Sequence, residues 1–268
     1  ANHIGEIEHL RCIVNPDVAV ITNTGDAHIG EFGSKANLIK AKGEIYSKNS
    51  KNIVNTQTEF KGDISFTPAS VQDSNNSKIG DVFASDVKKS RFTLNIYQQQ
   101  IQINLKLIGT HNIDNALAAS ACAYALGIDL KTIKSGLDST TPENGRLNII
   151  HTDQFTLIDD SYNASPSSIT AALETLKTFS GELVIVLGDM VELGTQTISL
   201  HQKISLQAQQ ISPNFYTFGP LAKYYQAQHF ASQTALAEHI LQHHRGATLL
   251  IKGSRIVQLD KLVKLLQK

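Results

Sequence analysis

Residues 155–166 have the sequence FTLIDDSYNASP, and this stretch decides the class of fold. Its first four residues form a short, mainly apolar run, which predicts a strand buried on both faces. Ser165 and Pro166 then supply an N-cap and a first helical position, so a helix is expected to follow at once. A strand that leads into a helix through a short polar segment is the repeating unit of a parallel sheet.

The same unit recurs toward the C-terminus. Strands are predicted near residues 183–187, 214–218 and 247–251, with helical segments between them. This alternation is typical of a Rossmann-like domain, in which ligands gather at the carboxyl ends of the parallel strands. We therefore predict a Rossmann-like C-terminal domain over residues 148–268.

The residues before this domain follow another pattern. A buried strand is predicted at residues 16–22, and a helix from about Ser34. Residues 91–108 alternate apolar and polar positions on both sides of a polar turn, which predicts an antiparallel hairpin. An Ala-rich helix is predicted from about 112 to 126, and a shorter one over 130–137. These elements indicate an α/β domain that carries an added hairpin.

The length of 268 residues also indicates two domains, because single domains most often contain about 100–150 residues. We place their boundary near Leu147, which gives a first domain over residues 1–147 and a second over 148–268. Lys and Arg together number 24, as do Asp and Glu, so the bulk positive charge of a nucleic-acid-binding protein is absent. No apolar stretch approaches the length of a membrane span, and the two cysteines form no CxxC pair. We expect a cytoplasmic monomer.

Lys42 occupies an unusual position in the helix predicted from Ser34. On a helical wheel it falls between Ile45 and Tyr46, on the apolar side. An unpaired ammonium is unfavourable in apolar surroundings, so Lys42 must reach the edge of the domain, pair with a carboxylate or be chemically modified. His28, in the preceding loop, is either solvated or a ligand. The residues alone leave these alternatives open.

Three other places offer polar groups at the ends of predicted elements. Asn112 is expected to be the N-cap of the Ala-rich helix, and Asn115 in its first turn could hydrogen-bond the edge of an adenine. Asp159 and Asp160 follow a strand and suit a ribose or a metal. Residues 252–255, KGSR, connect the last strand to the last helix and predict an anion site.

Two further patterns are weaker. Gly25 and Gly30 have P-loop spacing, but Glu31 stands where the P-loop lysine is required, and no Walker A sequence occurs in residues 1–268. His239 and His243 share a helix face and could bind a metal. A solvated face is the more ordinary explanation for such a pair.

Eight blocks of the sequence, in order, resemble the Mur ligases. They are ANHIGEI (1–7), AHIGEFGS (27–34), KAKGEIY (40–46), HNIDNALAA (111–119), NGRL (144–147), DDSYNASP (159–166), GDMVELG (188–194) and KGSR (252–255). The family has a UDP-substrate domain, a central ATPase domain that opens with a P-loop, and a Rossmann-like C-terminal domain. This chain resembles the central domain, entered partway, and all of the C-terminal one. We expect part of a longer ligase or the product of a split gene, inactive alone.

The resemblance implies a role for several residues. His28 resembles a magnesium ligand, and Lys42 resembles a lysine that the family carbamylates, which would let it hold a second magnesium ion. The residues implied to bind ATP are Asn112 and Asn115 at the adenine, Arg146, and Asp160 at the ribose. Those implied to face the other substrates are Asn2, Tyr162, Asn163, Lys252 and Ser254. Thr110 departs from the family, which commonly has Arg or Lys before the histidine of HNIDN.

The resemblance also implies a reaction, with ATP and Mg²⁺ as cofactors. The family type that is most similar joins D-Ala-D-Ala to UDP-N-acetylmuramoyl-tripeptide through an acyl phosphate, in bacterial peptidoglycan synthesis. Two alternatives stay open. One is another ligase of the Mur or folylpolyglutamate type, and the other is a non-catalytic nucleotide-binding module.

Overall fold

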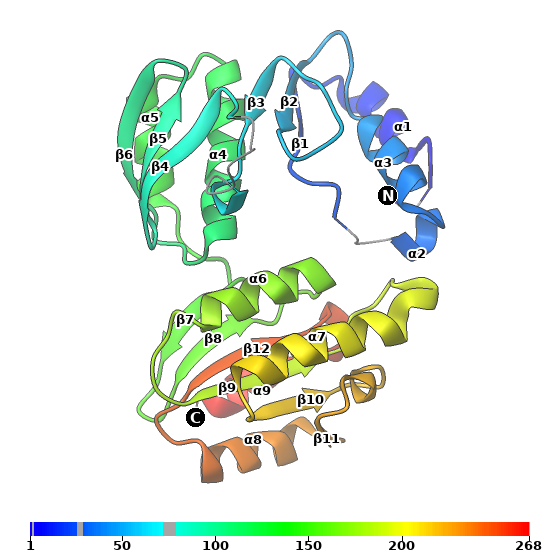
Figure 1. Ribbon diagram of the computed structural model, residues 1–268, viewed down its shortest axis with the longest axis vertical. Helices are drawn as coiled ribbons and strands as arrows, with labels where there is room; N and C mark the ends of the chain where they lie inside the picture. The colour runs from blue at the N-terminus through cyan, green and yellow to red at the C-terminus, as the bar shows by residue number, and fades with distance from the viewer. Residues whose placement is uncertain (2, 26–28, 72–78, 268) are drawn as a thin grey trace. The chain divides into compact units, whose positions relative to one another are not determined.

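A computed structural model describes the chain except for residue 2, residues 26–28, residues 72–78 and residue 268. The chain forms two compact units, Ala1–Thr141 and Pro142–Lys268 (Figure 1). This division lies before Leu147, near which the sequence placed it, so Arg146 and Leu147 belong to the second unit. None of the helices in the described part of the chain has the length and apolar character of a membrane span.

The first unit contains a mixed sheet with the strand order β1-β2-β3-β4-β5-β6. The strands are β1 (Val18–Ile21), β2 (Lys51–Asn55), β3 (Ile64–Phe66), β4 (Val82–Lys88), β5 (Arg91–Ile96) and β6 (Gln99–Asn104). β1 to β4 pair in parallel, whereas β4 with β5 and β5 with β6 pair antiparallel. The predicted hairpin is therefore confirmed, although its turn lies at residues 97–98 and β6 ends earlier than expected.

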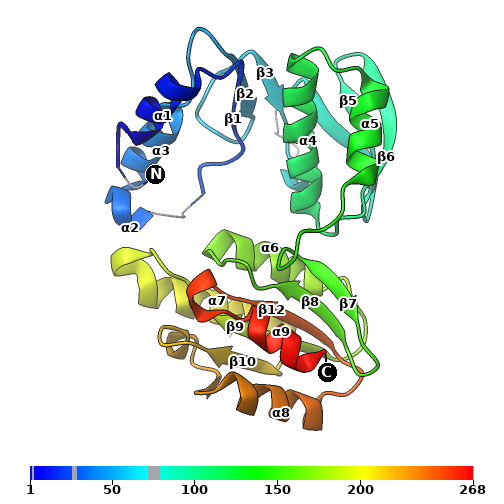
Figure 2. The same ribbon diagram turned by 180° about the vertical axis from the view of Figure 1, so that it is seen from behind.

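Helices cover this sheet. They are α1 (Glu6–Val14), α2 (Ile29–Phe32), α3 (Lys35–Gly43), α4 (Thr110–Ala125) and α5 (Leu130–Ser139), with a 3-10 turn η1 (Ala69–Val71). α3 begins next to Ser34, as predicted, and the Ser34 side chain caps it by accepting a hydrogen bond from the Asn37 N–H. α4 packs against β1 to β4 and α5 packs against β6 (Figure 2), and Ile113 and Leu117 of α4 share a core with Phe92 and other strand residues.

The second unit contains a sheet with the strand order β11-β10-β9-β12-β8-β7. The strands are β7 (Asn148–His151), β8 (Thr156–Asp160), β9 (Leu183–Gly188), β10 (Phe215–Phe218), β11 (Gln228–Phe230) and β12 (Thr248–Lys252). All neighbours pair in parallel except β7, which is antiparallel to β8. The predicted Rossmann-like parallel sheet is confirmed, with β12 at its centre and buried along its whole length.

Helices cover both faces of the second sheet. They are α6 (Pro166–Leu176), α7 (Thr197–Ile211), α8 (Gln233–His243) and α9 (Asp260–Leu266), with the 3-10 turns η2 (Gly194–Gln196), η3 (Ala222–Tyr225) and η4 (Arg255–Val257). α6 packs with α7 and α8 packs with α9, and the two pairs lie on opposite faces (Figures 1 and 2). Ser165 and Pro166 begin α6 through a capping box, as their sequence predicted.

Candidate functional site

Asp160 and Lys252 form a buried ion pair at the carboxyl ends of β8 and β12. The parallel register of the two strands places these residues opposite each other. The Lys252 Nζ donates to Asp160 Oδ2 at 2.6 Å and to the Asn163 carbonyl oxygen at 2.9 Å. Only 3% of Lys252 and 8% of Asp160 are exposed. Burial raises the pKa of the Asp160 carboxyl, and the Lys252 ammonium opposes that rise.

Residues 145–147, near the start of the second unit, are hydrogen-bonded to Asp160 and to Tyr162 beside it. The Leu147 N–H donates to Asp160 Oδ1 at 3.2 Å, and the Tyr162 N–H donates to the Gly145 carbonyl oxygen at 3.0 Å. Gly145 has a φ of +73°, and a Cβ there would lie 3.1 Å from the Tyr162 nitrogen, so the close approach requires glycine. Residues 145–147 are therefore held against the end of β8.

Arg146 and Tyr162 form an exposed cationic and aromatic surface beside the ion pair. The Arg146 guanidinium carbon lies 4.1 Å from the centre of the Tyr162 ring, within cation–π distance. Both residues are exposed, so a planar ligand can reach the ring and the guanidinium. The neighbouring Ser161 is buried, and its hydroxyl has no hydrogen-bond partner among the described residues.

Ser254 is bound to the protein rather than directed at solvent. Its N–H and its hydroxyl both donate to the Asp189 carbonyl oxygen, each at 2.9 Å. The Asp189 carboxylate in turn accepts the N–H groups of Leu221 and Ala222, at 2.9 and 2.7 Å. The KGSR turn leads first into η4 and only later into α9, which corrects the predicted direct entry into the last helix. In this structure the polar groups of Lys252 and Ser254 thus contact protein atoms.

Lys42 lies in the last turn of α3, and the structure corrects the helical wheel. The helix ends at Gly43, so Ile45 and Tyr46 are not part of it. Lys42 is half-buried, and its Nζ donates to the Asn23 carbonyl oxygen at 3.2 Å. It therefore reaches the carboxyl end of β1, where it lines a hollow of about 420 Å³. The ammonium thus lies at the end of β1, and the other two alternatives, pairing with a carboxylate and chemical modification, stay open.

Asn2 and His28, two of the expected site residues, lie outside the described residues. Among the residues that are described, no group of three or more His, Cys, Asp or Glu could hold a metal ion. The Lys42 ammonium is itself a cation and cannot ligate magnesium. The described side chains alone therefore do not form a magnesium site. His239 and His243 stack on α8 with ring centres 4.4 Å apart and gain no further ligand there.

Asn112 and Asn115 lie together near the start of α4. The helix begins at Thr110 with Gly109 as its N-cap, which corrects the prediction that Asn112 caps it. The Asn112 amide instead donates to the Ile108 carbonyl oxygen at 2.7 Å, and the Asn115 amide faces the Asn112 side-chain oxygen at 3.4 Å. Asn115 is exposed, so its amide edge is accessible to a ligand.

Two acids make structural contacts that the sequence did not predict, although it places one of them, Asp189, at the carboxyl end of a strand. Glu44, two residues after Lys42, accepts the N–H groups of Gly5 and Glu8 at the start of α1, at 2.8 and 3.3 Å. Asp189 holds the loop after β10, and burial raises the pKa of its carboxyl. Their partners lie more than 30 residues away in sequence, so local pattern gives no sign of them.

Comparisons with known proteins agree with this architecture. The Mur ligase middle domain matches residues 1–123, and the Mur ligase glutamate ligase domain matches residues 145–255. A chain with these two domains in this order, on an α/β fold, belongs to the Mur ligase family.

Particular members of the family are similar over nearly the whole chain. The UDP-N-acetylmuramoyl-tripeptide–D-alanyl-D-alanine ligase of Haemophilus influenzae is 31% identical over 98% of this chain. A crystal structure of MurF from Acinetobacter baumannii is 32% identical, with a TM-score of 0.86 over 100% of the chain. The MurF ligase from Thermotoga maritima in complex with ADP has the same fold, with a TM-score of 0.86 at 23% identity. The chain spans 62%, 63% and 65% of these three proteins, respectively.

Proposed function

We propose that this chain supplies part of an ATP-dependent ligase that joins D-Ala-D-Ala to UDP-N-acetylmuramoyl-tripeptide in the bacterial cytoplasm. The observation that carries the proposal is the similarity to the Haemophilus influenzae ligase of that name, at 31% identity over 98% of the chain. The solved structures named MurF support it with the same fold over the whole chain. We also propose that residues 1–268 alone give no turnover.

The proposed reaction has two steps. The γ-phosphoryl group of ATP passes to the tripeptide carboxylate, which gives an acyl phosphate and ADP. The amine of D-Ala-D-Ala then attacks the acyl carbon, the C–O bond to phosphate breaks, and inorganic phosphate leaves as the amide forms. Activation is needed because a free carboxylate is a poor acylating agent.

The described residues would bind and orient the nucleotide. The exposed amide of Asn115 is suited to the edge of the adenine, with Asn112 beside it to fix its orientation. Arg146, held above Tyr162, offers a cation to the phosphates and an aromatic face beside it. For Asp160 to bind the ribose, its carboxylate would have to share its oxygens with Lys252 and the Leu147 N–H.

The magnesium part of the proposal rests on the family resemblance. Bound near the phosphates, Mg²⁺ would spread the negative charge of the phosphoryl transfer. The residues that the family uses for it correspond to His28 and a carbamylated Lys42. The accessible Lys42 amine, at the carboxyl end of β1, is compatible with modification by carbon dioxide. The substrates would be met by Asn2 and by the exposed Tyr162 and Asn163. For Lys252 and Ser254 to face them, these two side chains would have to exchange their present contacts with the protein.

A hybrid enzyme tests the proposal directly. Residues 1–268 would replace the matching portion of the Haemophilus influenzae ligase, and purified hybrid would be assayed for ADP, phosphate and the amide product. The expected result is steady-state release of ADP and phosphate, together with the amide product, that requires both the tripeptide substrate and D-Ala-D-Ala. The matched variant Lys42→Ala should lose most of the activity and regain part of it with short-chain carboxylic acids.

Other outcomes would contradict the proposal. Turnover with glutamate in place of D-Ala-D-Ala would indicate another ligase of the superfamily. Nucleotide binding by the hybrid without any condensation would indicate a non-catalytic module. Full activity of Lys42→Ala would remove the proposed role of the modified lysine while leaving the ligase assignment intact.

A further inference from the structure

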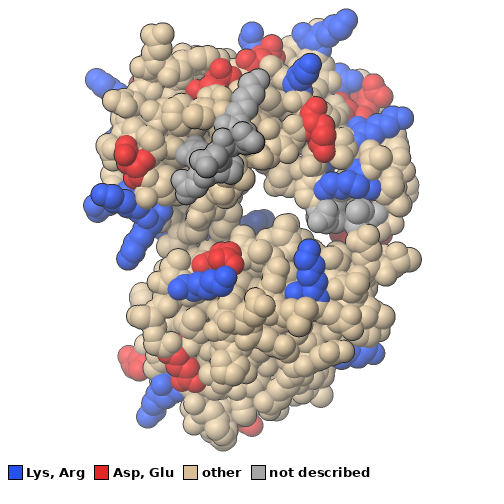
Figure 3. Space-filling model, in the orientation of Figure 1, with Lys and Arg blue, Asp and Glu red and all other residues tan. Residues whose placement is uncertain are grey.

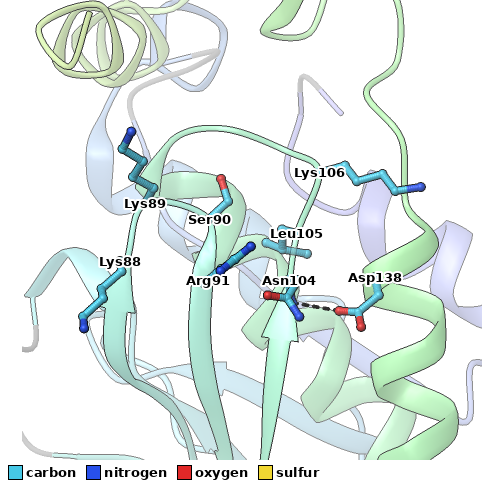
Figure 4. Close-up of a pocket in the computed structure, with 8 residues that line it drawn as sticks. All are labelled: Lys88, Lys89, Ser90, Arg91, Asn104, Leu105, Lys106 and Asp138. Atoms are coloured by element: carbon cyan, nitrogen blue, oxygen red, sulfur yellow. Dashed lines mark hydrogen bonds between the residues drawn. The ribbon is translucent and has the colours of Figure 1, made fainter.

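Two adjoining hollows on the first unit are lined by thirteen residues, six of which are cationic. The first, of about 840 Å³, lies where the turn between β4 and β5 meets the end of β6 and α5 (Figure 4). The second, of about 760 Å³, continues along α5 and shares Lys106 and Asp138 with the first. The cations that line them are Lys88, Lys89, Arg91, Lys106, Lys131 and Lys134, and the only carboxylate in either lining is that of Asp138.

The single carboxylate is already engaged. Asp138 Oδ1 accepts the Asn104 N–H at 2.8 Å, and its Oδ2 accepts the Lys134 Nζ at 2.6 Å. Partial burial opposes ionisation of Asp138, but the hydrogen bonds from Lys134 and Asn104 outweigh it and lower the pKa of the carboxyl. Asp138 is thus ionised at neutral pH and balanced by Lys134. It leaves the charges of the other five cations uncompensated.

The other cations have no acidic partner within the described part of the chain. Lys88, Lys89, Arg91, Lys106 and Lys131 take part in none of its ion pairs. The nearest acid on the same hairpin, Asp86, instead accepts hydrogen bonds from the hydroxyls of Thr93 and Ser85. The chain as a whole has no net charge, so this concentration of positive charge is local.

Hydrogen bonds join the backbone segments on which these cations lie. The Ser90 hydroxyl donates to the Leu107 carbonyl oxygen at 2.6 Å, and the Leu105 N–H donates to the Ser90 carbonyl oxygen at 3.0 Å. Lys134 Nζ also donates to the Gln102 carbonyl oxygen at 2.7 Å, which joins α5 to β6. The backbone that presents the lysines is therefore fixed, while their long side chains can adjust to a ligand.

We propose that these two hollows form a binding site for a ligand that carries several phosphate groups. Several lysine ammonium groups around an open surface suit an extended polyanion. Each ammonium is a compact charge on a flexible side chain, so it can donate hydrogen bonds without a fixed geometry. The site shares no residue with those expected to bind ATP, and it does not depend on the ligase activity. Two sources share this chemistry: a soluble polyphosphorylated compound and the headgroups of anionic phospholipids.

The test uses the chain of 268 residues with two probes. Inorganic tripolyphosphate would be titrated by calorimetry at low ionic strength, and vesicles with and without phosphatidylglycerol would be tested by co-sedimentation. The site variant is Lys88→Ala/Lys89→Ala/Lys106→Ala. The matched control is Lys48→Ala/Lys203→Ala/Lys261→Ala, which removes three exposed lysines that line neither hollow. Both variants change the net charge equally, and thermal melts would verify folding.

The expected result is binding of at least one probe that falls about tenfold or more in the site variant and less than about twofold in the control. The dependence of affinity on salt should also become shallower in the site variant alone, because fewer counterions are exchanged. Binding of tripolyphosphate but not of vesicles would identify a soluble ligand, and the reverse would identify a membrane surface. Binding of neither probe by the unmodified chain, or an equal loss in both variants, would overturn the proposal.

Discussion

Replacing Lys252 by methionine should destabilise the second unit strongly, because it leaves the Asp160 carboxylate buried without its counter-ion. The two side chains are 4% and 12% exposed, and the ammonium and carboxylate lie 2.6 Å apart. Removal of one partner from a buried ion pair typically costs about 3–5 kcal/mol in the free energy of unfolding. We expect a loss in this range for Lys252→Met, and a comparable loss for Asp160→Asn, which leaves the ammonium buried without its carboxylate.

The double variant Lys252→Met/Asp160→Asn provides the control. Its asparagine keeps an oxygen that can accept the Leu147 N–H, and neither charge remains. The loss in the double variant should be well below the sum of the two single losses, by about 2 kcal/mol or more. Urea unfolding followed by circular dichroism measures all three, and hydrogen exchange assigns the transition to residues 142–268.

The pH dependence of Lys252→Met gives an independent check with a defined sign. Burial already raises the pKa of Asp160, and loss of the ammonium removes the interaction that opposes the rise. A raised carboxyl pKa in the folded state favours folding at low pH and disfavours it as the pH rises through that value. The loss in the free energy of unfolding caused by Lys252→Met should therefore become smaller as the pH falls from 7 to 5. Single losses below about 1 kcal/mol that add in the double variant would refute this reasoning.

Three further predictions concern other described residues. Burial lowers the pKa of His201, whose Nε2 accepts a backbone N–H at 3.1 Å. The free energy of unfolding should therefore fall as the pH drops below the ordinary histidine pKa. In urea melts at a series of pH values, His201→Gln should show a weaker dependence on pH in this range. Gly219→Ala should destabilise the second unit by about 2 kcal/mol more than Gly246→Ala. Both glycines have positive φ, but only at Gly219 would a Cβ meet another residue, the Asp189 carboxylate at 2.4 Å. Thermal melts compare the two variants, and equal losses of stability would show that this close contact does not matter. In the hybrid ligase, Asn115→Ala should raise the KM for ATP about five- to tenfold without changing the KM for the tripeptide, as measured by steady-state kinetics. An equal rise in both KM values would indicate that Asn115 acts in helix packing instead.

Much of the second unit follows from its sequence because its strands are continuous apolar runs. The strands predicted near 183–187, 214–218 and 247–251 are present as β9, β10 and β12. The strands β7 and β11 were missed because both are short edge strands, whose residues are mostly half-buried or exposed and leave no clear apolar pattern. In the first unit, β2, β3 and β4 also escaped prediction, because β2 and β3 contain only two apolar residues each and β4 ends in exposed residues.

The site was harder to predict because its contacts join distant parts of the chain. The sequence placed Asp160 and Lys252 at strand ends, but their pairing depends on the register of β8 with β12. Lys42 does not lie on an apolar helix face, because α3 ends at Gly43, before Ile45 and Tyr46, the two residues that defined the apolar side of the helical wheel. Asn112 was expected to be the N-cap of α4, but the helix begins earlier, at Thr110, and its N-cap is Gly109. Glycine is also acceptable at an N-cap, so the sequence did not distinguish the two.

The choice of amine acceptor tests the proposed function most directly. In the hybrid ligase, kcat/KM would be measured with ATP and UDP-N-acetylmuramoyl-tripeptide for D-Ala-D-Ala, glutamate and diaminopimelate in turn. D-Ala-D-Ala should be preferred over both by about a hundredfold or more, a difference of about 2.7 kcal/mol in transition-state binding. Equal use of the three amines, or a preference for one of the other two, would contradict the proposed function.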